Sequence, residues 1–114
     1  MKIKKSLIGL GLIIAGIILF VILLSNESCS DICVNDAKCI ESKATLYVQE
    51  GCHACERQEK LFGDKAEYLD IVDCWYEREK CIEQGITATP TWIIYGNKYV
   101  GVHSIDKLKN LTAC

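Results

Sequence analysis

Residues 50–63, EGCHACERQEKLFG, place a Cys-x-x-Cys pair, Cys52 and Cys55, between two different sequence patterns. The preceding run ATLYVQ (44–49) predicts a strand, and CHACERQEKLF (52–62) predicts a helix that stops at Gly63, with Leu61 and Phe62 as apolar anchors. Two thiols at this spacing can close a small disulfide ring, and a helix N-terminus stabilises the first thiolate. The pattern therefore predicts thiol–disulfide exchange, with Cys52 attacking and Cys55 resolving.

Two further features bear on this chemistry. His53 lies between the cysteines, where its cationic form would stabilise the Cys52 thiolate; the alternative is a solvated histidine at a helix start. Thr89-Pro90 contains the only proline of the chain. We expect Pro90 to be cis and Thr89 to face Cys52, offering its backbone to an extended substrate segment; the alternative is an ordinary trans turn.

The remaining patterns complete a mixed α/β order. The expected elements are a strand at 67–73, a helix at 75–84, a hairpin of strands 91–95 and 98–101 around Gly96-Asn97, and a last helix capped by Ser104 and continuing through Leu108 and Leu111. The order β-α-β-α-β-β-α, with the first two strands parallel through a right-handed crossover, predicts a thioredoxin-like core.

One apolar block precedes this core. Residues 7–24, LIGLGLIIAGIILFVILL, carry no charge, and as a helix they would be about 27 Å long, close to the thickness of a bilayer core. Lysines at positions 2, 4 and 5 predict a cytoplasmic N-terminus and an extracytoplasmic remainder. We therefore expect a basic segment (1–6), a transmembrane signal anchor (7–24), a connector (25–43) and a thioredoxin-like domain (44–114).

A cleaved signal peptide is the alternative for this block. The apolar run exceeds the usual h-region of about 7–15 residues, and no A-x-A-like site follows it. A retained single-pass anchor in the cell membrane is therefore favoured.

Charge and cysteine usage agree with that location. Of the 13 Lys and Arg residues, three precede the apolar block, so residues 25–114 hold 10 against 15 Asp and Glu, a net charge of −5. This acidity argues against nucleic acid or anionic lipid as a partner. All eight cysteines follow the apolar block, a density typical of disulfide-bonded extracytoplasmic domains.

Two non-catalytic readings compete with the redox one. Cys52 and Cys55 could ligate zinc together with Cys74 and Cys81, or they could form an inert structural disulfide. The strand–helix junction, the downstream Thr89-Pro90 and the oxidising location favour redox chemistry, for which we expect neither a metal nor another cofactor.

Four features occur together in residues 44–114: GCHACERQEKLFG (51–63), IVDC (71–74) with the following Cys81, GITATPTWIIYGNKYVG (85–101) and the Leu108/Leu111 end. Through this combination, residues 44–114 resemble the thioredoxin-like domain that is fused to, or paired with, bacterial and plant-type vitamin K epoxide reductase homologues. The resemblance implies that the Cys52–Cys55 pair relays electrons from substrate proteins to a membrane quinone-linked reductase, and that Cys74 and Cys81 form a structural disulfide.

The chain departs from that family in two ways. The usual family motif is Cys-Pro-His-Cys, whereas this chain has Cys-His-Ala-Cys, so the redox poise cannot be carried over. The four-helix reductase is absent from this chain, so quinone chemistry would belong to a separate partner. An anchored disulfide reductant or isomerase is the enzymatic alternative to an oxidant.

Four cysteines remain, with three possible pairings. The last helix should return toward the end of the sheet where the first strand begins, which brings Cys114 near Cys39. We therefore expect a Cys39–Cys114 clasp and a short accessory pair, Cys29–Cys33; the alternative is that these cysteines stay unordered or bridge to a partner.

Overall fold

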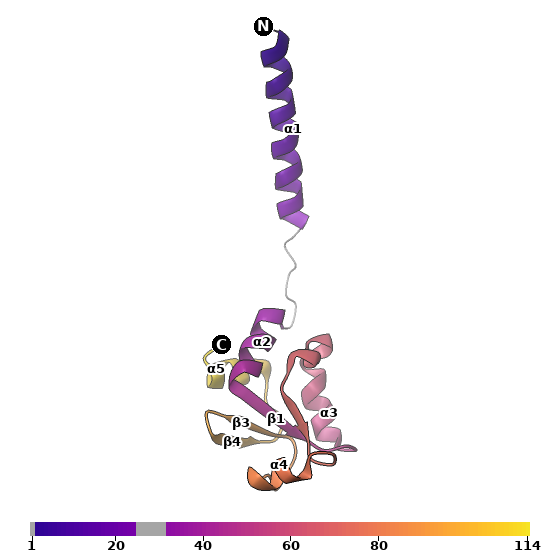
Figure 1. Cartoon of the computed structure of the whole chain (residues 1–114), viewed down its shortest axis with the longest axis vertical. Helices are drawn as coiled ribbons and strands as arrows, with labels where there is room; N and C mark the ends of the chain where they lie inside the picture. Colours follow the sequence, from indigo (N-terminus) through magenta and orange to yellow (C-terminus); the bar gives the residue numbers. More distant parts are fainter. Residues whose placement is uncertain (1, 25–31) are drawn as a thin grey trace.

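The computed structural model describes residues 2–24 and 32–114. The described chain contains a four-stranded mixed sheet in the order β2-β1-β3-β4 (Figure 1). The strands are β1 (Ala44–Val48), β2 (Ile71–Asp73), β3 (Thr91–Ile94) and β4 (Asn97–Val100). β1 pairs with β2 in parallel and with β3 antiparallel, and β3 pairs antiparallel with β4. The predicted parallel crossover and terminal hairpin are confirmed, and β4 runs in the direction of β1.

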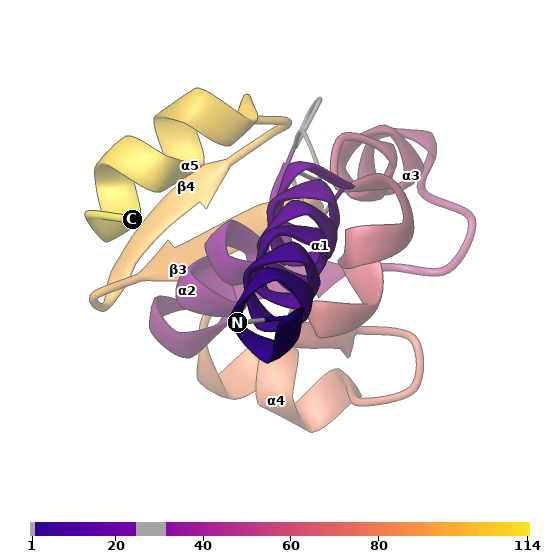
Figure 2. The same cartoon turned by 90° about the horizontal axis from the view of Figure 1, so that it is seen from above.

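Helices cover both faces of this sheet. They are α2 (Val34–Lys43), α3 (His53–Lys60), the 3-10 helix η1 (Gly63–Tyr68), α4 (Arg78–Glu83) and α5 (Ile105–Thr112). In Figure 2, α3 and α5 lie toward opposite edges of the domain, with α4 apart from both.

The two faces follow from the two-residue period of β1 and β3. Leu46 and Trp92, both fully buried, point into a core shared with α2, α3 and α5. Their neighbours Tyr47 and Ile93 belong to a smaller cluster on the other face, where Cys81 of α4 packs. The alternation therefore gives α3 the larger core and gives α4 the smaller one.

The connector expected at 25–43 is partly wrong. Residues 34–43 form α2, which buries Ala37 and Ile40 completely in the main core. Val34, Ala37 and Ile40 are spaced three apart, which gives one apolar face of a helix, but charged residues between them hide the pattern. Residues 25–31 lie outside the described part of the chain.

Two other boundaries and one expected core contact differ from the expectation. The strand expected at 67–73 begins only at Ile71, because residues 63–68 form η1. The helix expected from Trp75 begins at Arg78, after a turn in which the Trp75 N–H donates to the Asp73 carboxylate (2.9 Å). Leu61 is 41% exposed, so only Phe62 of the two expected anchors enters the core.

The hairpin turn is shifted by one residue. Ile94 pairs with Asn97, so Tyr95 and Gly96 form the two-residue turn, rather than Gly96 and Asn97. Both have positive φ, 50° and 77°, as a type I′ turn requires. The Tyr95 hydroxyl donates to the carbonyl of Thr112 (3.1 Å), which holds this unusual position against α5.

The two ends of the domain are tied together at the start of β1. Cys39 of α2 and the C-terminal Cys114 form a disulfide with 6.0 Å between their Cα atoms, the pairing that the topology favoured. Lys43 donates to the Thr112 carbonyl (3.0 Å), and Lys109 pairs with Asp36 (3.2 Å). The predicted Ser104 cap is confirmed, since its hydroxyl accepts from the Lys107 N–H.

The N-terminal helix α1 spans Lys2–Leu24, and its described side chains, from Ile8 to Leu23, are predominantly exposed and apolar. Among the described residues, no helix is both long and apolar enough to cross a membrane. The side chains of Leu7 and Leu24, the two ends of the expected transmembrane segment, lie outside the described ones.

Candidate active site

The Cys52–Cys55 pair lies at the N-terminus of α3, where the chain turns from β1 into the helix. Cys52 is the N-cap residue, with extended backbone (φ −83°, ψ 107°), and Cys55 lies in the first helical turn. The two form a disulfide, with 5.2 Å between their Cα atoms. Cys52 is half-buried, whereas Cys55 is 3% exposed. An incoming thiolate or disulfide would therefore meet the sulfur of Cys52 first.

The Cys52 sulfur takes the place of an N-cap oxygen. It accepts the backbone N–H of Cys55 (3.2 Å), one of the N–H groups that a helix start leaves without an intrahelical partner. The Cys52 backbone N–H donates to the Gln49 carbonyl (3.1 Å), and the Cys52 carbonyl accepts from the Glu56 backbone N–H (3.2 Å). Because the sulfur is held against an N–H donor and the helix N-terminus, negative charge on it is stabilised.

Thr89 faces the same sulfur. The Cys52 Sγ lies 3.6 Å from both the carbonyl oxygen and the hydroxyl of Thr89. The Thr89-Pro90 peptide bond is cis. The hydroxyl of Thr91 donates to the Ala88 carbonyl (2.6 Å), and the Gly101 N–H donates to the Pro90 carbonyl (2.8 Å), so the loop is fixed on both sides of the proline.

The segment before the proline keeps unused backbone donors. Thr87 and Ala88 are exposed and Thr89 is half-buried. Among the described residues, no acceptor takes a hydrogen bond from the backbone N–H groups of these three residues. An extended peptide laid beside them could accept those hydrogen bonds.

His53, between the two cysteines, is a surface residue. Its side chain is 89% exposed, and Nδ1 lies 3.8 Å from the Glu56 carboxylate one turn along α3. Its proximity in sequence to both cysteines still places any imidazolium charge beside the redox pair, where the Glu56 carboxylate partly offsets it.

A buried glutamine joins the site to the rest of the core, and the sequence analysis did not identify it. Gln58 is fully buried, three residues after Cys55 on the same helix. Its Oε1 accepts from Trp92 Nε1 (3.1 Å) and the His103 N–H (2.7 Å), and its Nε2 donates to the His103 carbonyl (3.0 Å). This side chain ties α3 to β3 and to the segment before α5. In the sequence, the only indication that Gln58 is buried beside the site is its spacing of three residues from Cys55.

Glu59 was also missed. This half-buried residue lies one turn beyond Cys55, and burial raises the pKa of its carboxyl above the usual value. The carboxylates of Asp73, at the end of β2, and Glu56 raise this pKa further. Neutral Glu59 is therefore favoured in the folded domain over a wider pH range than in an unfolded chain.

The other described cysteines form separate disulfides. Cys74 and Cys81 form a disulfide (Cα–Cα 5.7 Å) that packs against Tyr47 and Val72. Cys33 is disulfide-bonded, and its expected partner Cys29 lies outside the described residues. Among the described residues, no three His, Cys, Asp or Glu side chains lie close enough together to hold a metal ion.

No protein-family model matches the chain. Among solved structures, the solution structure of oxidised thioredoxin from Plasmodium falciparum is similar, with a TM-score of 0.48 and 19% identity over 73% of this chain and 91% of that one. Thioredoxin from Aeropyrum pernix gives a TM-score of 0.42 and 18% identity over 69% and 81%. The thioredoxin-like description of the fold depends on the strand order and pairing of this chain.

Proposed function

We propose that this chain is a thiol–disulfide oxidoreductase whose redox centre is Cys52–Cys55. The observation that carries the proposal is the position of the Cys52 sulfur. It caps α3, accepts the Cys55 N–H, and faces Thr89, beside which a polypeptide could bind. A structural disulfide needs neither a thiolate-stabilising donor nor an adjacent strip of unused backbone N–H groups.

The exchange reaction transfers electrons and protons only between the substrate and the Cys52–Cys55 pair. In the oxidising direction, a substrate thiolate attacks the Cys52 sulfur and the Cys52–Cys55 bond breaks, which releases Cys55 as a thiolate. A second substrate thiolate then attacks the substrate sulfur of the mixed disulfide and releases Cys52 as a thiolate, stabilised by its N–H donor. The substrate loses two electrons and two protons, and the protein gains a dithiol. The reducing direction is the reverse.

We also propose that α1 anchors this domain in the membrane, with the redox centre on the extracytoplasmic side. The uncharged segment 7–24, the lysines before it and the exposed apolar side chains of α1 support the anchor. Disulfides at Cys39–Cys114 and Cys74–Cys81 favour an oxidising location. The chain from α1 enters the domain through α2, which ends where β1 begins. Cys52 follows the opposite end of β1.

The partner for reoxidation that we propose is a membrane quinone-linked homologue of vitamin K epoxide reductase. The resemblance over residues 44–114 supports it, and so does an anchor that would keep both proteins in one membrane. The reaction is a second exchange: the Cys52 thiolate attacks a disulfide of the partner, Cys55 resolves the mixed disulfide, and the electrons pass to the quinone.

The reduction potential of the Cys52–Cys55 pair tests the proposal. We expect a value closer to about −120 mV, typical of a strong oxidant, than to about −270 mV, typical of a reductant. The measurement is made on the full chain in detergent by equilibration with glutathione, with metal analysis on the same sample. Stoichiometric zinc bound by the reduced protein, or a pair that does not exchange with glutathione, would contradict the assignment.

A further inference from the structure

A cavity beside the redox centre is not used by the exchange chemistry above. It has a volume of about 680 Å³ and lies between α4 and the loop that leads to Pro90. Its lining includes Thr89, whose carbonyl oxygen and hydroxyl contact the Cys52 sulfur. The cavity therefore begins where a substrate cysteine would react and extends toward α4.

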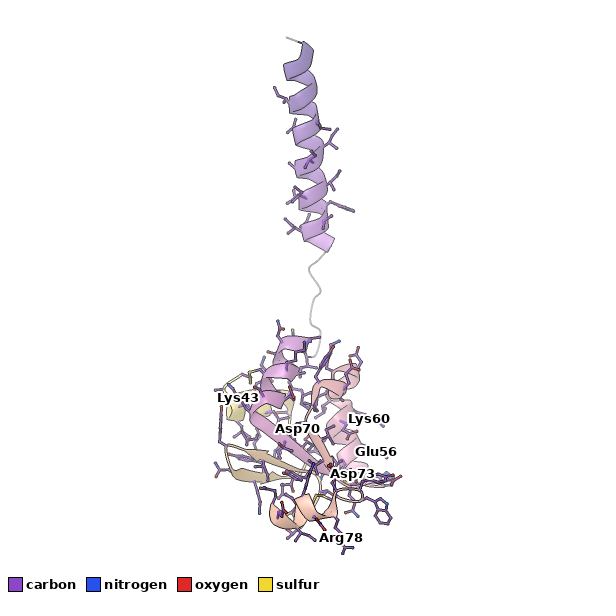
Figure 3. The ribbon with its side chains drawn as sticks, viewed as in Figure 1. Lys43, Glu56, Lys60, Asp70, Asp73 and Arg78 are labelled. Atoms are coloured by element: carbon purple, nitrogen blue, oxygen red, sulfur yellow. A yellow bond between two sulfur atoms is a disulfide. The ribbon has the colours of Figure 1, made fainter. Side chains whose placement is uncertain are left out.

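Arg78 lines this cavity and has no anionic partner among the described residues. The neighbouring acidic side chain Glu77 pairs with Lys80 instead. Figure 3 shows Arg78 on α4, at the same end of the domain as Glu56 and Asp73 and away from Lys43. A guanidinium without a carboxylate partner can form two parallel hydrogen bonds with a carboxylate supplied by a ligand.

Apolar surface flanks this cation. Trp75 and Ile82 also line the cavity and are 65% and 67% exposed, more than large apolar side chains usually are in a folded domain. The Cys74–Cys81 disulfide and the small cluster around Val72 fix the segment that carries them. The wall is thus rigid, apolar at its sides and cationic at Arg78, which suits a side chain with methylene groups and a terminal carboxylate.

We propose that this cavity binds an acidic side chain, glutamate in particular, two residues from the reacting cysteine of a substrate polypeptide. In an extended peptide, side chains two positions apart point to the same face and are about 6.7 Å apart along the chain. A peptide that presents its cysteine to Cys52 while paired with residues 87–89 would direct its next same-face side chain along the domain surface. The carboxylate pairs with Arg78 and the methylene groups pack against Trp75 and Ile82. This inference rests on the proposed exchange at Cys52.

The test uses peptides that contain one cysteine and differ only in Glu or Gln two residues before or after it. Their thiolates react with the oxidised full chain in detergent at low salt. The second-order rate constant of this reaction is measured by stopped-flow fluorescence, or by quenching followed by mass spectrometry. We expect at least one Glu peptide to react about fivefold faster than its Gln counterpart. This advantage should shrink at 0.5 M salt, because the pair is partly exposed.

Arg78→Gln should reduce the Glu advantage to less than twofold and leave the rates of the Gln peptides unchanged. Arg57→Gln is the matched control, because Arg57 is the other arginine of the chain and lies outside this cavity. It should keep the full advantage. Dithiothreitol, which has no carboxylate, should react equally with all three proteins.

Two results would overturn the proposal. Equal rates for the Glu and Gln peptides at both positions, with normal dithiothreitol reactivity, would remove the cavity's role and leave the exchange function intact. A Glu advantage that survives Arg78→Gln would assign the selectivity to another group. If dithiothreitol also fails to reduce Cys52–Cys55, the exchange function falls with it.

Discussion

The sulfur of Cys52 lies 3.6 Å from the carbonyl oxygen of Thr89, although 37 residues separate them in the chain. The contact forms because β1 and β3 are antiparallel neighbours: the chain leaves β1 toward Cys52 at the same end of the sheet where Thr89 enters β3. The pairing of Tyr47 with Thr91 fixes this register. A one-residue slip of β3 would turn Trp92 out of the main core that it shares with Leu46, so the core that holds the sheet also holds the site together.

The first prediction concerns the order of attack at the redox pair. Cys52→Ser should abolish exchange with peptide thiols, because the more accessible sulfur of the pair is gone. Cys55→Ser should instead accumulate stable mixed disulfides between Cys52 and substrates, because the resolving thiol is missing. Non-reducing electrophoresis and mass analysis distinguish the two. Exchange at the wild-type rate in either variant would show that the assignment is wrong.

A second prediction concerns His53. An imidazolium beside the cysteines favours the Cys52 thiolate, and hence the reduced form, so His53→Ala should make the pair less oxidising, by about 20 mV for a surface charge effect near 1 kcal/mol. The effect should be small because the side chain is 89% exposed and lies near Glu56. Equilibration with glutathione at pH 6 measures it. Glu56→Gln is the matched control and should shift the potential in the opposite direction.

Gln58 gives a prediction about stability. Gln58→Ala would leave the buried Trp92 N–H without its acceptor, free the His103 backbone groups and open a cavity, at a cost of about 3 kcal/mol in the free energy of unfolding. Arg57→Ala, one residue earlier and exposed, should change it by less than about 0.5 kcal/mol. Urea titration followed by the fluorescence of the buried Trp92 checks both. Equal changes in the free energy of unfolding of the two variants would show that Gln58 does not have this structural role.

Much of the fold could be predicted from the sequence because its signals are local. The Ser104 cap depends on a residue type at a fixed position, and the order of strands and helices depends on apolar periodicity and glycines. The Cys39–Cys114 pairing followed once the strand directions were known, since those directions place both chain ends beside the start of β1.

The rest depends on tertiary contacts that leave weak traces in the sequence. α2 was missed because the apolar face formed by Ala37 and Ile40 is narrow and lies between charged residues. The role of Gln58 requires Trp92 and His103, which are 34 and 45 residues away. The cavity at Arg78 required knowing that α4 starts after Trp75, so that the indole is left exposed on a turn.

Glu59 predicts a pH dependence of stability. Burial and the nearby carboxylates raise the pKa of its carboxyl in the folded state, so the associated stabilisation is fully present below the unfolded pKa and is lost as the pH rises through the folded value. Glu59→Gln should therefore leave stability near pH 3.5 almost unchanged and increase it at pH 7, relative to the wild type. Urea midpoints at the two pH values measure this difference. Glu67→Gln, which replaces an exposed glutamate in η1, is the matched control for the loss of one carboxyl group.

The last prediction compares two disulfides by the lengths of the loops they close. Cys39 and Cys114 are 75 residues apart in sequence, whereas Cys74 and Cys81 are 7 apart. In the chain-entropy model, closing these loops stabilises the folded state by about 4 and about 2 kcal/mol, respectively. The Cys39→Ser/Cys114→Ser double variant should therefore lose more stability than the Cys74→Ser/Cys81→Ser variant. Both are measured by urea titration of the full chain in the same detergent. Because Lys43 and Lys109 still join α2 to α5, the clasp variant should keep native circular dichroism in the absence of urea. If the Cys74→Ser/Cys81→Ser variant loses as much stability as the Cys39→Ser/Cys114→Ser variant, or more, then packing around Cys81, rather than loop closure, sets the contribution of these bonds.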